Sequence, residues 1–322
     1  MSVAVPDVKE TWSGKITEVT LGAGPEKGGT RGKTVTVGGE TGLPFLHFEG
    51  SMPHRPVIAV EVSDRRPEEW SRLLLEAWGD AVKDPAVWAA RAEQAGADLI
   101  ALTLDSAHPE RGDTGAKEAK QTVRRVLEAT TLPLLVYGPG QRDKDNEVLV
   151  AAAEEAAGER VALGNCEDKN YRTIVAAAMA NDHVIVAKSP IDVNLAKQLN
   201  VLIGDMGLGR DRILIDPTTG ALGYGLEYSY SVMERIRLAA LTGDAALQQP
   251  TVLTAGYEAW RAKEARTGED VPAEWGDWKQ RGILWECNTS LTLLETGADI
   301  LVLRHPDTLP LVRRVIDKLM AA

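Results

Sequence analysis

The sequence predicts an α/β fold, a TIM (β/α)8 barrel with an N-terminal β-hairpin extension. Eight short apolar runs lack polar alternation, as strands buried on both faces of a parallel sheet do. They span residues 57–62, 98–104, 132–138, 160–165, 183–188, 212–217, 250–256 and 298–304. A helix-length segment follows each run. Eight alternations of a buried strand with a helix are typical of a closed barrel, which places its functional residues after the strands.

Upstream of the barrel, two alternating segments flank the Gly-rich stretch GAGPEKGGTRG and predict a β-hairpin. These segments are residues 15–21 and 34–37. A barrel takes roughly 250 residues, so a chain of 322 residues has room for such an extension. We therefore expect residues 1–56 to close the bottom of the barrel and residues 57–322 to form the barrel itself.

The connecting helices carry apolar residues on one side only. In residues 192–207, Val193, Ala196 and Leu199 recur at helical spacing. Residues 257–277, after the seventh strand, instead mix aromatic and charged residues. This insertion is expected on the strand-end face, where it could form a lid or a partner contact. Its tryptophans either anchor a partner or pack the insertion onto the barrel.

Composition excludes several classes of protein. A net charge of −11 argues against nucleic-acid binding, which depends on Lys and Arg. No run of 18 or more apolar residues predicts a membrane span, and the first residues lack the features of a signal peptide. Two cysteines, Cys166 and Cys287, without a CxxC motif fit a reducing cytoplasm. They are also too few to hold an iron–sulfur cluster within this chain by cysteine ligands alone.

Polar residues follow five of the predicted strands, where a barrel builds its site. They are Asp105, Asn165, Ser189, Asp216 and Thr254. Their side chains can donate or accept hydrogen bonds, or protonate a leaving nitrogen if burial raises a carboxyl pKa. For the two aspartates and the asparagine, the alternative is that each caps the helix that follows. No Ser–His–Asp or Cys–His set and no zinc-binding pattern emerges, so we predict neither catalytic nor metal-ligating residues.

The loop DPTTGALGYGLEYS, residues 216–229, is the richest local signal. Gly220, Gly223 and Gly225 permit close approach of the backbone to a bound surface. Tyr224 stands between two of these glycines and is expected to be exposed. The spacing matches neither a P-loop nor a GxGxxG fingerprint, so the loop predicts a binding surface for a large flat ligand or another protein.

Several stretches taken together resemble one family nearly end to end. They are residues 28–40, 163–171, 188–203, 215–241, 254–265, 281–286 and 304–306. The resemblance is to the small subunit of the corrinoid iron–sulfur protein of the reductive acetyl-CoA pathway and the related delta subunit of archaeal acetyl-CoA decarbonylase/synthase. The segment IDPTTGALGYGLEYSYSVMERIRLAAL is its most specific part.

This resemblance implies a non-catalytic barrel that pairs with a large subunit. The large subunit is expected to carry a [4Fe–4S] cluster and a corrinoid-binding domain, so that the corrinoid (a cobalamin) lies between that domain and the top of this barrel. A methyltetrahydrofolate methyltransferase would supply the methyl group, and acetyl-CoA synthase would receive it. Two cysteines agree with a cluster held by the partner, and the missing catalytic set agrees with chemistry supplied by the cofactor.

Under the resemblance, the strand-end residues form a platform that faces the corrinoid. The predicted cofactor-binding residues are Asp105, Asn165, Ser189, Asp216, Gly220, Gly223, Tyr224, Gly225 and Thr254. No DxHxxG motif is present, so no histidine of this chain is expected on cobalt. Two alternatives stay open: a stand-alone methyltransferase that holds a pterin with its strand-end Asp and Asn residues, and a scaffold that touches no ligand.

Overall fold

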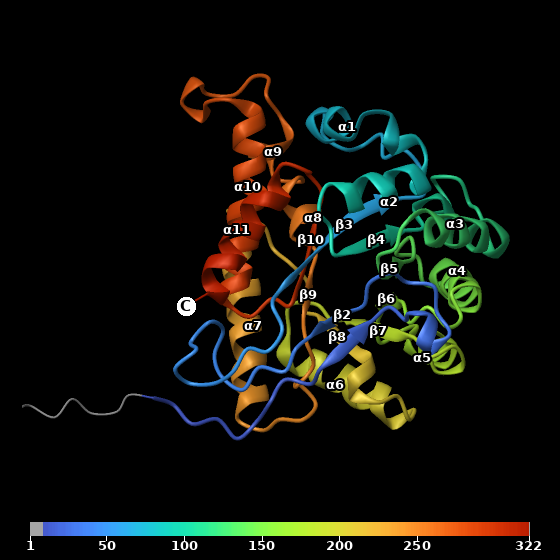
Figure 1. The fold of residues 1–322 in the computed structure, drawn as a ribbon. Coiled ribbons are helices and arrows are strands. Elements are labelled where there is room, and N and C mark those ends of the chain that lie inside the picture. The colour runs from blue at the N-terminus through green and yellow to red at the C-terminus, as the bar shows by residue number, and fades with distance from the viewer. Residues whose placement is uncertain (1–8, 322) are drawn as a thin grey trace, which may run out of the picture.

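The computed structural model describes residues 9–321, which contain the predicted eight-stranded parallel sheet with helices around it (Figure 1). Neighbouring strands follow the order β8-β7-β6-β5-β4-β3-β10-β9. A parallel bridge between Ile215 and Thr251 joins the two edge strands. The predicted TIM barrel is therefore confirmed. The strands are β3 (Val57–Ser63), β4 (Leu99–Thr103), β5 (Leu134–Tyr137), β6 (Ala162–Cys166), β7 (Val184–Lys188), β8 (Ile213–Asp216), β9 (Val252–Leu253) and β10 (Ile300–Leu303).

The seventh barrel strand, β9, is much shorter than the predicted run of residues 250–256. Pro250 has no N–H to donate to a neighbouring strand, and its carbonyl accepts the closing hydrogen bond from Ile215 N at 2.8 Å. At the other end, helix α8 already begins at Ala255. Only four residues lie between this proline and the helix, and two of them, Val252 and Leu253, form the strand.

Helices cover the outside of the sheet. Helix α6 begins after Asp192, whose carboxylate accepts hydrogen bonds from Asn194 N and Leu195 N. It buries Ala196 and Leu199, as the apolar stripe predicts. The helices are α1 (Arg72–Trp78), α2 (Pro85–Gln94), α3 (Ala116–Ala129), α4 (Arg142–Glu155), α5 (Tyr171–Ala180), α6 (Val193–Asp205), α7 (Leu226–Leu241), α8 (Ala255–Ala259), α9 (Lys263–Arg266), α10 (Trp278–Glu295) and α11 (Thr308–Met320), with 3-10 turns η1 (Pro25–Lys27), η2 (Gly79–Lys83), η3 (Asp105–Ala107), η4 (Arg210–Arg212) and η5 (Ala273–Trp275).

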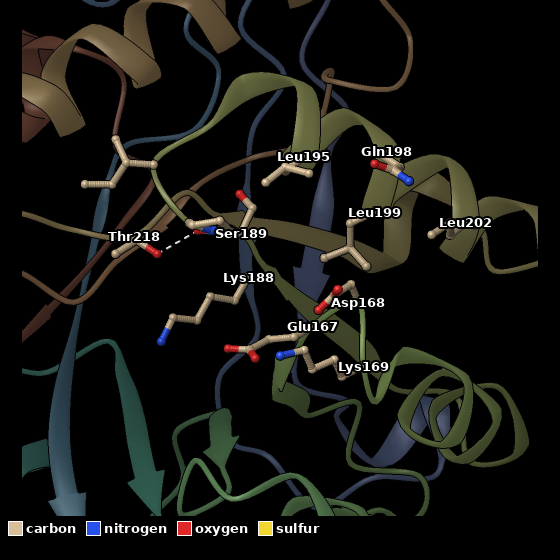
Figure 2. A pocket seen from close by; sticks show the side chains of 12 residues that line it. Glu167, Asp168, Lys169, Lys188, Ser189, Leu195, Gln198, Leu199, Leu202 and Thr218 are labelled. Atoms are coloured by element: carbon tan, nitrogen blue, oxygen red, sulfur yellow. Dashed lines mark hydrogen bonds between the residues drawn. The ribbon is translucent and has the colours of Figure 1, made fainter.

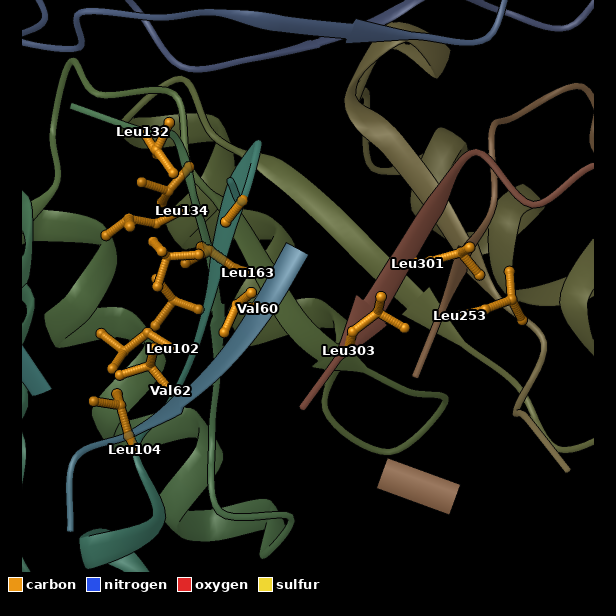
Figure 3. Packing of buried hydrophobic residues seen from close by; sticks show 14 of the residues in the cluster. Val60, Val62, Leu102, Leu104, Leu132, Leu134, Leu163, Leu253, Leu301 and Leu303 are labelled. Carbon is orange, nitrogen blue, oxygen red and sulfur yellow. The ribbon is translucent and has the colours of Figure 1, made fainter. Parts of the chain in front are cut away.

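The core has an inner and an outer layer because successive residues of a strand point to opposite faces. In β3, Val57 and Ala59 belong to the cluster that fills the barrel, whereas Ile58 and Val60 belong to the cluster under the helices. Figure 3 shows the outer cluster, with Val60 on β3 and other strands contributing leucines. Both faces are apolar, which explains why the strands appear in the sequence as continuous apolar runs.

The predicted hairpin is also present. Strands β1 (Val19–Leu21) and β2 (Val35–Val37) pair antiparallel, with Val19 opposite Val37. Their apolar side chains join the inner cluster together with Val57, the first residue of β3. The hairpin therefore packs where the barrel strands begin. Residues 1–8, which the sequence assigns to the same extension, lie outside the described residues, and the boundary at residue 56 stays a prediction.

A buried cluster of charges ties the extension to the barrel. Arg237 of α7 donates to Glu40 of the extension at 3.3 Å, to Asp299 at 3.4 Å and to the carbonyl of Gly297 at 2.6 Å. Asp299 also accepts a hydrogen bond from Thr251 N at 2.7 Å. Burial and the charge of Glu40 raise the pKa of Asp299 well above its usual range. We call Glu40, Arg237 and Asp299 the basal cluster.

Among residues 9–321, no helix has the length and apolar character needed to cross a membrane.

Candidate functional site

The carboxyl ends of the strands surround a polar cavity of about 280 Å³, which we call the mouth cavity. Four of the predicted site residues line it, from four different strand ends: Asp105, Asn165, Asp216 and Thr254. Residues outside the predicted binding set complete its wall: Glu61, Ala101, Thr103, His108, Arg111, Tyr137, Gly138, Pro139, Gly140, Lys188, Tyr257 and Val302. The barrel thus brings together side chains that lie far apart in the sequence.

Asp216 ends β8 and is only 1% exposed. Its Oδ1 accepts a hydrogen bond from Thr218 N at 2.9 Å, which is the local turn contact that a capping role predicts. No group within residues 9–321 donates to its Oδ2. Burial raises the pKa of Asp216, while the nearby charge of Lys188 opposes the rise. Asp216 therefore presents to the cavity a carboxyl oxygen that has no partner among the described residues.

Two other carboxylates at the mouth are already neutralised. Both oxygens of Glu61 accept hydrogen bonds from Arg304, each at 2.7 Å. Asp105 accepts from Arg65 Nε at 2.6 Å and also pairs with Arg111. Asp105 lies at the cavity wall as predicted, but its two oxygens are engaged by guanidinium groups rather than free for a ligand. It opens η3 without a side-chain capping bond.

Tyr137 is a site residue that the sequence analysis missed. It ends β5, is 7% exposed, and its hydroxyl has no hydrogen-bond partner among the described residues. Burial raises the pKa of Tyr137 well above its usual value, and the charges of Asp216 and Glu61 add to the rise. The sequence did contain a signal. Tyr137 stands two residues after the inward-facing Leu135, so both side chains point to the same face of the strand, and the tyrosine carries a hydroxyl group there.

Asn165 and Lys188 supply further polar groups that are unpaired within the described part of the chain. Asn170, not Asn165, makes the local capping contacts: its Oδ1 accepts from Glu167 N at 2.7 Å and its Nδ2 donates to the Asn165 carbonyl at 3.1 Å. The Asn165 amide side chain has no hydrogen bond to residues 9–321. The ammonium group of Lys188 likewise makes no hydrogen bond or ion pair within that range. The mouth cavity therefore brings together the free carboxyl oxygen of Asp216, the Tyr137 hydroxyl, the Asn165 amide and the Lys188 ammonium group.

Ser189 lies apart from this group. It lines a groove of about 540 Å³ between the β6–α5 loop and helix α6, with Leu195 and Leu199 on the opposite wall (Figure 2). Its Oγ is buried without a partner among the described residues, and its carbonyl accepts a hydrogen bond from Thr218 Oγ1 at 2.6 Å. Lys188 borders both this groove and the mouth cavity. The structure therefore places Ser189 in a groove next to the mouth cavity rather than in it.

The three glycines of the loop after β8 have different roles. At Gly220, a Cβ atom would lie 2.5 Å from the carbonyl oxygen of Gly225, so this glycine is required by packing within the loop. Gly223 and Gly225 have φ angles of 74° and 93°, but a Cβ at either would approach no atom closer than 3.5 Å. Tyr224 is 52% exposed, and its hydroxyl donates to Glu264 at 3.1 Å. The predicted open surface is therefore limited to residues 223–225.

The insertion of residues 257–277 folds over this face as α8, α9 and η5. Arg261, Lys263 and Arg266 surround a shallow groove beside Tyr224. Trp260 is buried and stacks on His305 with ring centroids 5.6 Å apart. For this tryptophan the structure supports packing of the insertion onto the barrel.

Among the described residues that line the mouth cavity, His108 is the sole histidine and there is no cysteine or serine, so neither a Ser–His nor a Cys–His pair is assembled there. His305 is sealed under Trp260, and burial lowers its pKa to about 4. Cys166 and Cys287 are buried free thiols whose pKa burial raises. Within residues 9–321, no three His, Cys, Asp or Glu side chains are grouped as a metal site would require.

Solved structures with a similar fold include dihydropteroate synthases. The enzyme from Xanthomonas albilineans with 4-aminobenzoic acid superimposes with a TM-score of 0.58 at 17% identity, covering 87% of this chain and 98% of that one. The enzyme from Thermus thermophilus in complex with 6HMPPP gives a TM-score of 0.55 at 16% identity, over 86% of this chain and 98% of that one. At this identity the likeness establishes the barrel fold alone.

Sequence comparisons are more specific. Residues 18–315 match the family described as CO dehydrogenase/acetyl-CoA synthase delta subunit. The acetyl-CoA decarbonylase/synthase complex subunit delta of Archaeoglobus fulgidus is 41% identical over 97% of this chain and 70% of its own length. Subunit delta 1 of Methanosarcina thermophila is 39% identical over 97% and 72%. The chain belongs to the family of CO dehydrogenase/acetyl-CoA synthase delta subunits, as the resemblance seen in the sequence predicts.

Proposed function

We propose that this chain is the non-catalytic small subunit of a heterodimeric corrinoid iron–sulfur methyl carrier. The observation that carries this proposal is its 41% identity, over 97% of its length, to a protein named as the delta subunit of the acetyl-CoA decarbonylase/synthase complex. The site chemistry agrees. The mouth offers hydrogen-bonding groups from several strands and no assembled nucleophile–base pair among the described residues, which suits a subunit that positions a cofactor.

The shape of the strand-end face fits a corrinoid that lies across the mouth. A corrin ring with its peripheral amides is far larger than a cavity of about 280 Å³, so the ring cannot enter it. The rim instead carries exposed Tyr224, Tyr228 and Tyr257 and the open backbone of Gly223 and Gly225. Aromatic faces and exposed backbone suit contact with a flat macrocycle.

Individual contacts follow from this arrangement. Asn165 and Thr254 stand at the mouth with side chains that can donate to and accept from corrin amides. The corrinoid would supply the cobalt atom that carries the methyl group. The chain itself would orient the ring and exclude water from one of its faces.

The proposed complex leaves the [4Fe–4S] cluster to the large subunit. Cys166 lies in β6 and Cys287 in α10, both are buried, and the chain has no others. A methyltetrahydrofolate methyltransferase and acetyl-CoA synthase complete the proposed set of partners, and the cytoplasm is the proposed location.

Co-purification tests the proposal directly. The chain is expressed alone and together with a candidate large subunit, and cobalt and iron are measured in each product. We expect cobalt only in the complex, with iron following the partner. Methyl transfer from methyltetrahydrofolate by the isolated chain would establish the stand-alone methyltransferase instead. A complex that forms equally well with and without corrinoid, and whose cobalt content is unaffected by rim variants, would establish the ligand-free scaffold.

A rim variant sharpens this test. Gly223→Trp adds a bulky side chain to the open loop, and Gly28→Trp is its matched control in the N-terminal extension. Both glycines have a positive φ, 74° and 82°, and open space for a Cβ, so the backbone strain is similar. We expect only Gly223→Trp to lower cobalt retention in the complex. Equal cobalt content in both variants would contradict a corrinoid contact at this loop.

A further inference from the structure

We propose that the groove between the β6–α5 loop and helix α6, which we call the side groove, binds a zwitterion with an apolar side chain, namely an apolar amino acid or a dipeptide of such residues. Of the described residues that line this groove, only Lys188 also lines the mouth cavity. Such a site is independent of the proposed function, because its ligand is not the corrinoid and binds without the large subunit and without cobalt.

Helix α6 supplies an apolar wall of the side groove. Leu195, Leu199 and Leu202 line the groove at spacings of four and three residues, so they share one side of the helix. Leu195 is 44% exposed, and Ile191, just before the helix, is 38% exposed. The volume of about 540 Å³ lies within the range of ligand pockets. An apolar side chain of a ligand placed against this wall would remove these exposed groups from water, which favours binding.

Charged side chains line the groove opposite this wall. Glu167, Asp168 and Lys169 belong to the β6–α5 loop, and Lys188 ends β7 (Figure 2). Within residues 9–321, none of these four side chains forms an ion pair. The groove therefore offers a ligand two carboxylates and two ammonium groups. A ligand with a single charge would be attracted by one pair and repelled by the other, whereas a zwitterion can match both.

Ser189 adds a polar group at the bottom of the groove, where it is 3% exposed. Its N–H donates to the carbonyl of Asp216 at 2.9 Å, and its carbonyl accepts from Thr218 Oγ1 at 2.6 Å. Its hydroxyl, in contrast, has no partner among the described residues. The backbone bonds thus fix the residue, while the hydroxyl stays available. An ammonium, carboxylate or peptide group of a ligand can satisfy it, because a hydroxyl both donates and accepts.

The apolar wall, the paired charges and the hydroxyl together select the class of ligand. An apolar amino acid carries an ammonium group, a carboxylate and an apolar side chain on one carbon atom. A hydrocarbon would leave the four charges and the Ser189 hydroxyl unmatched. A zwitterion without an apolar side chain, such as glycine, would leave Leu195 and Ile191 exposed to water.

Isothermal titration calorimetry of the purified chain tests this site with L-leucine, L-phenylalanine and leucyl-leucine as probes. Each ligand control lacks one feature: 3-methylbutylamine the carboxylate, 4-methylpentanoate the ammonium group, and glycine the apolar side chain. We expect saturable binding of at least one probe. The amine and the acid should each bind about fivefold more weakly, as loss of one exposed charge contact predicts. Glycine should bind at least about tenfold more weakly, because it buries no apolar side chain.

Two pairs of variants locate the binding. Leu195→Ser should weaken binding of the probe about fivefold, whereas Leu238→Ser on α7 should leave it unchanged. The two leucines are 44% and 43% exposed, so neither variant opens the core. Lys169→Gln should also weaken binding about fivefold, whereas Lys117→Gln removes the same charge on α3, away from the groove, and should have no effect. Circular dichroism confirms that each variant is folded.

Absence of saturable binding by the folded chain would overturn the proposal, as would equal binding of a probe and of its amine or acid control. Equal affinity for leucyl-leucine and for its acetylated, amidated form would also overturn it, and would indicate a groove for a peptide segment of a partner protein. Each of these results is separate from the cobalt measurement, because no corrinoid and no large subunit are present.

Discussion

The two ends of the barrel both bury ionisable groups, but the ends differ in whether these groups have hydrogen-bond partners among residues 9–321. Where the strands begin, Arg237 donates to Glu40 and Asp299, and a backbone N–H completes the set. At the mouth, the Tyr137 hydroxyl and one oxygen of Asp216 have no partner within residues 9–321. The extension covers the first end with apolar side chains, whereas the second end opens into a cavity.

This contrast distinguishes polar groups that hold the fold together from polar groups of the candidate site. A buried ion network with its hydrogen bonds made helps to hold elements in one arrangement, and the basal cluster links the extension, α7 and the loop before β10. A buried polar group left unpaired lowers stability, and such atoms also occur away from the mouth, as at His183 Nδ1 and Trp88 Nε1. The same residue types can therefore either stabilise the fold or stay open to another molecule, depending on whether other residues of the chain bond to them.

Breaking the basal cluster should have the largest effect. Arg237→Met leaves Glu40 and Asp299 buried without their cation, and we expect a loss of about 3–5 kcal/mol in the free energy of unfolding. The control Arg124→Met removes an exposed ion pair to Glu155 and should change stability by less than about 1 kcal/mol. Urea denaturation followed by circular dichroism measures both. Equal losses would show that the basal cluster is not structural.

A pH titration extends the comparison to His305, a histidine that is buried under Trp260. The folded chain keeps His305 neutral down to a pKa of about 4, whereas the unfolded chain binds the proton near pH 6.5. Lowering the pH between these values therefore favours unfolding, by up to about 3 kcal/mol. His305→Asn removes this group, so its free energy of unfolding should fall less between pH 7 and pH 4. Parallel pH curves for the two proteins would contradict the expectation.

The smallest effect is expected at the mouth itself. Tyr137→Phe removes a hydroxyl that makes no bond to the described residues, so the free energy of unfolding should stay constant or rise by up to about 1 kcal/mol. Tyr171→Phe removes a hydroxyl that accepts a hydrogen bond from Arg172 Nε at 3.2 Å and should be neutral or slightly destabilising. Thermal and urea unfolding report both changes. If Tyr137→Phe lowers the free energy of unfolding by more than about 1 kcal/mol, the Tyr137 hydroxyl stabilises the fold, as the basal cluster does.

Much of the fold was predictable because its signals are local. Strands buried on both faces appear as apolar runs, and α6 shows its buried side through Ala196 and Leu199. The length of β9 was not predictable from the run alone. Pro250 shortens it at one end and the start of α8 at Ala255 shortens it at the other, and only the barrel closure shows which residues still pair.

The candidate site was predictable in position but not in chemistry. Asp105 and Asp216 both follow a strand, yet Arg65, 40 residues away in sequence, engages the first, and no cation among residues 9–321 bonds to the second. Gly220 and Gly223 look alike in sequence, but only Gly220 lies against the Gly225 carbonyl. Tyr137 lies within the predicted apolar run of residues 132–138, and only the structure shows that its hydroxyl has no partner among the described residues.

The sequence by itself determined the (β/α)8 barrel, the hairpin, the strand-end location of the candidate site and the family, since these depend on patterns of neighbouring residues. The tertiary structure alone decided which polar groups are paired and which are free. Pairing is a contact between distant segments, and it depends on where closure of the barrel places each side chain. In this protein the Asp105 carboxylate is paired with arginine, whereas one oxygen of the Asp216 carboxyl group has no partner among residues 9–321.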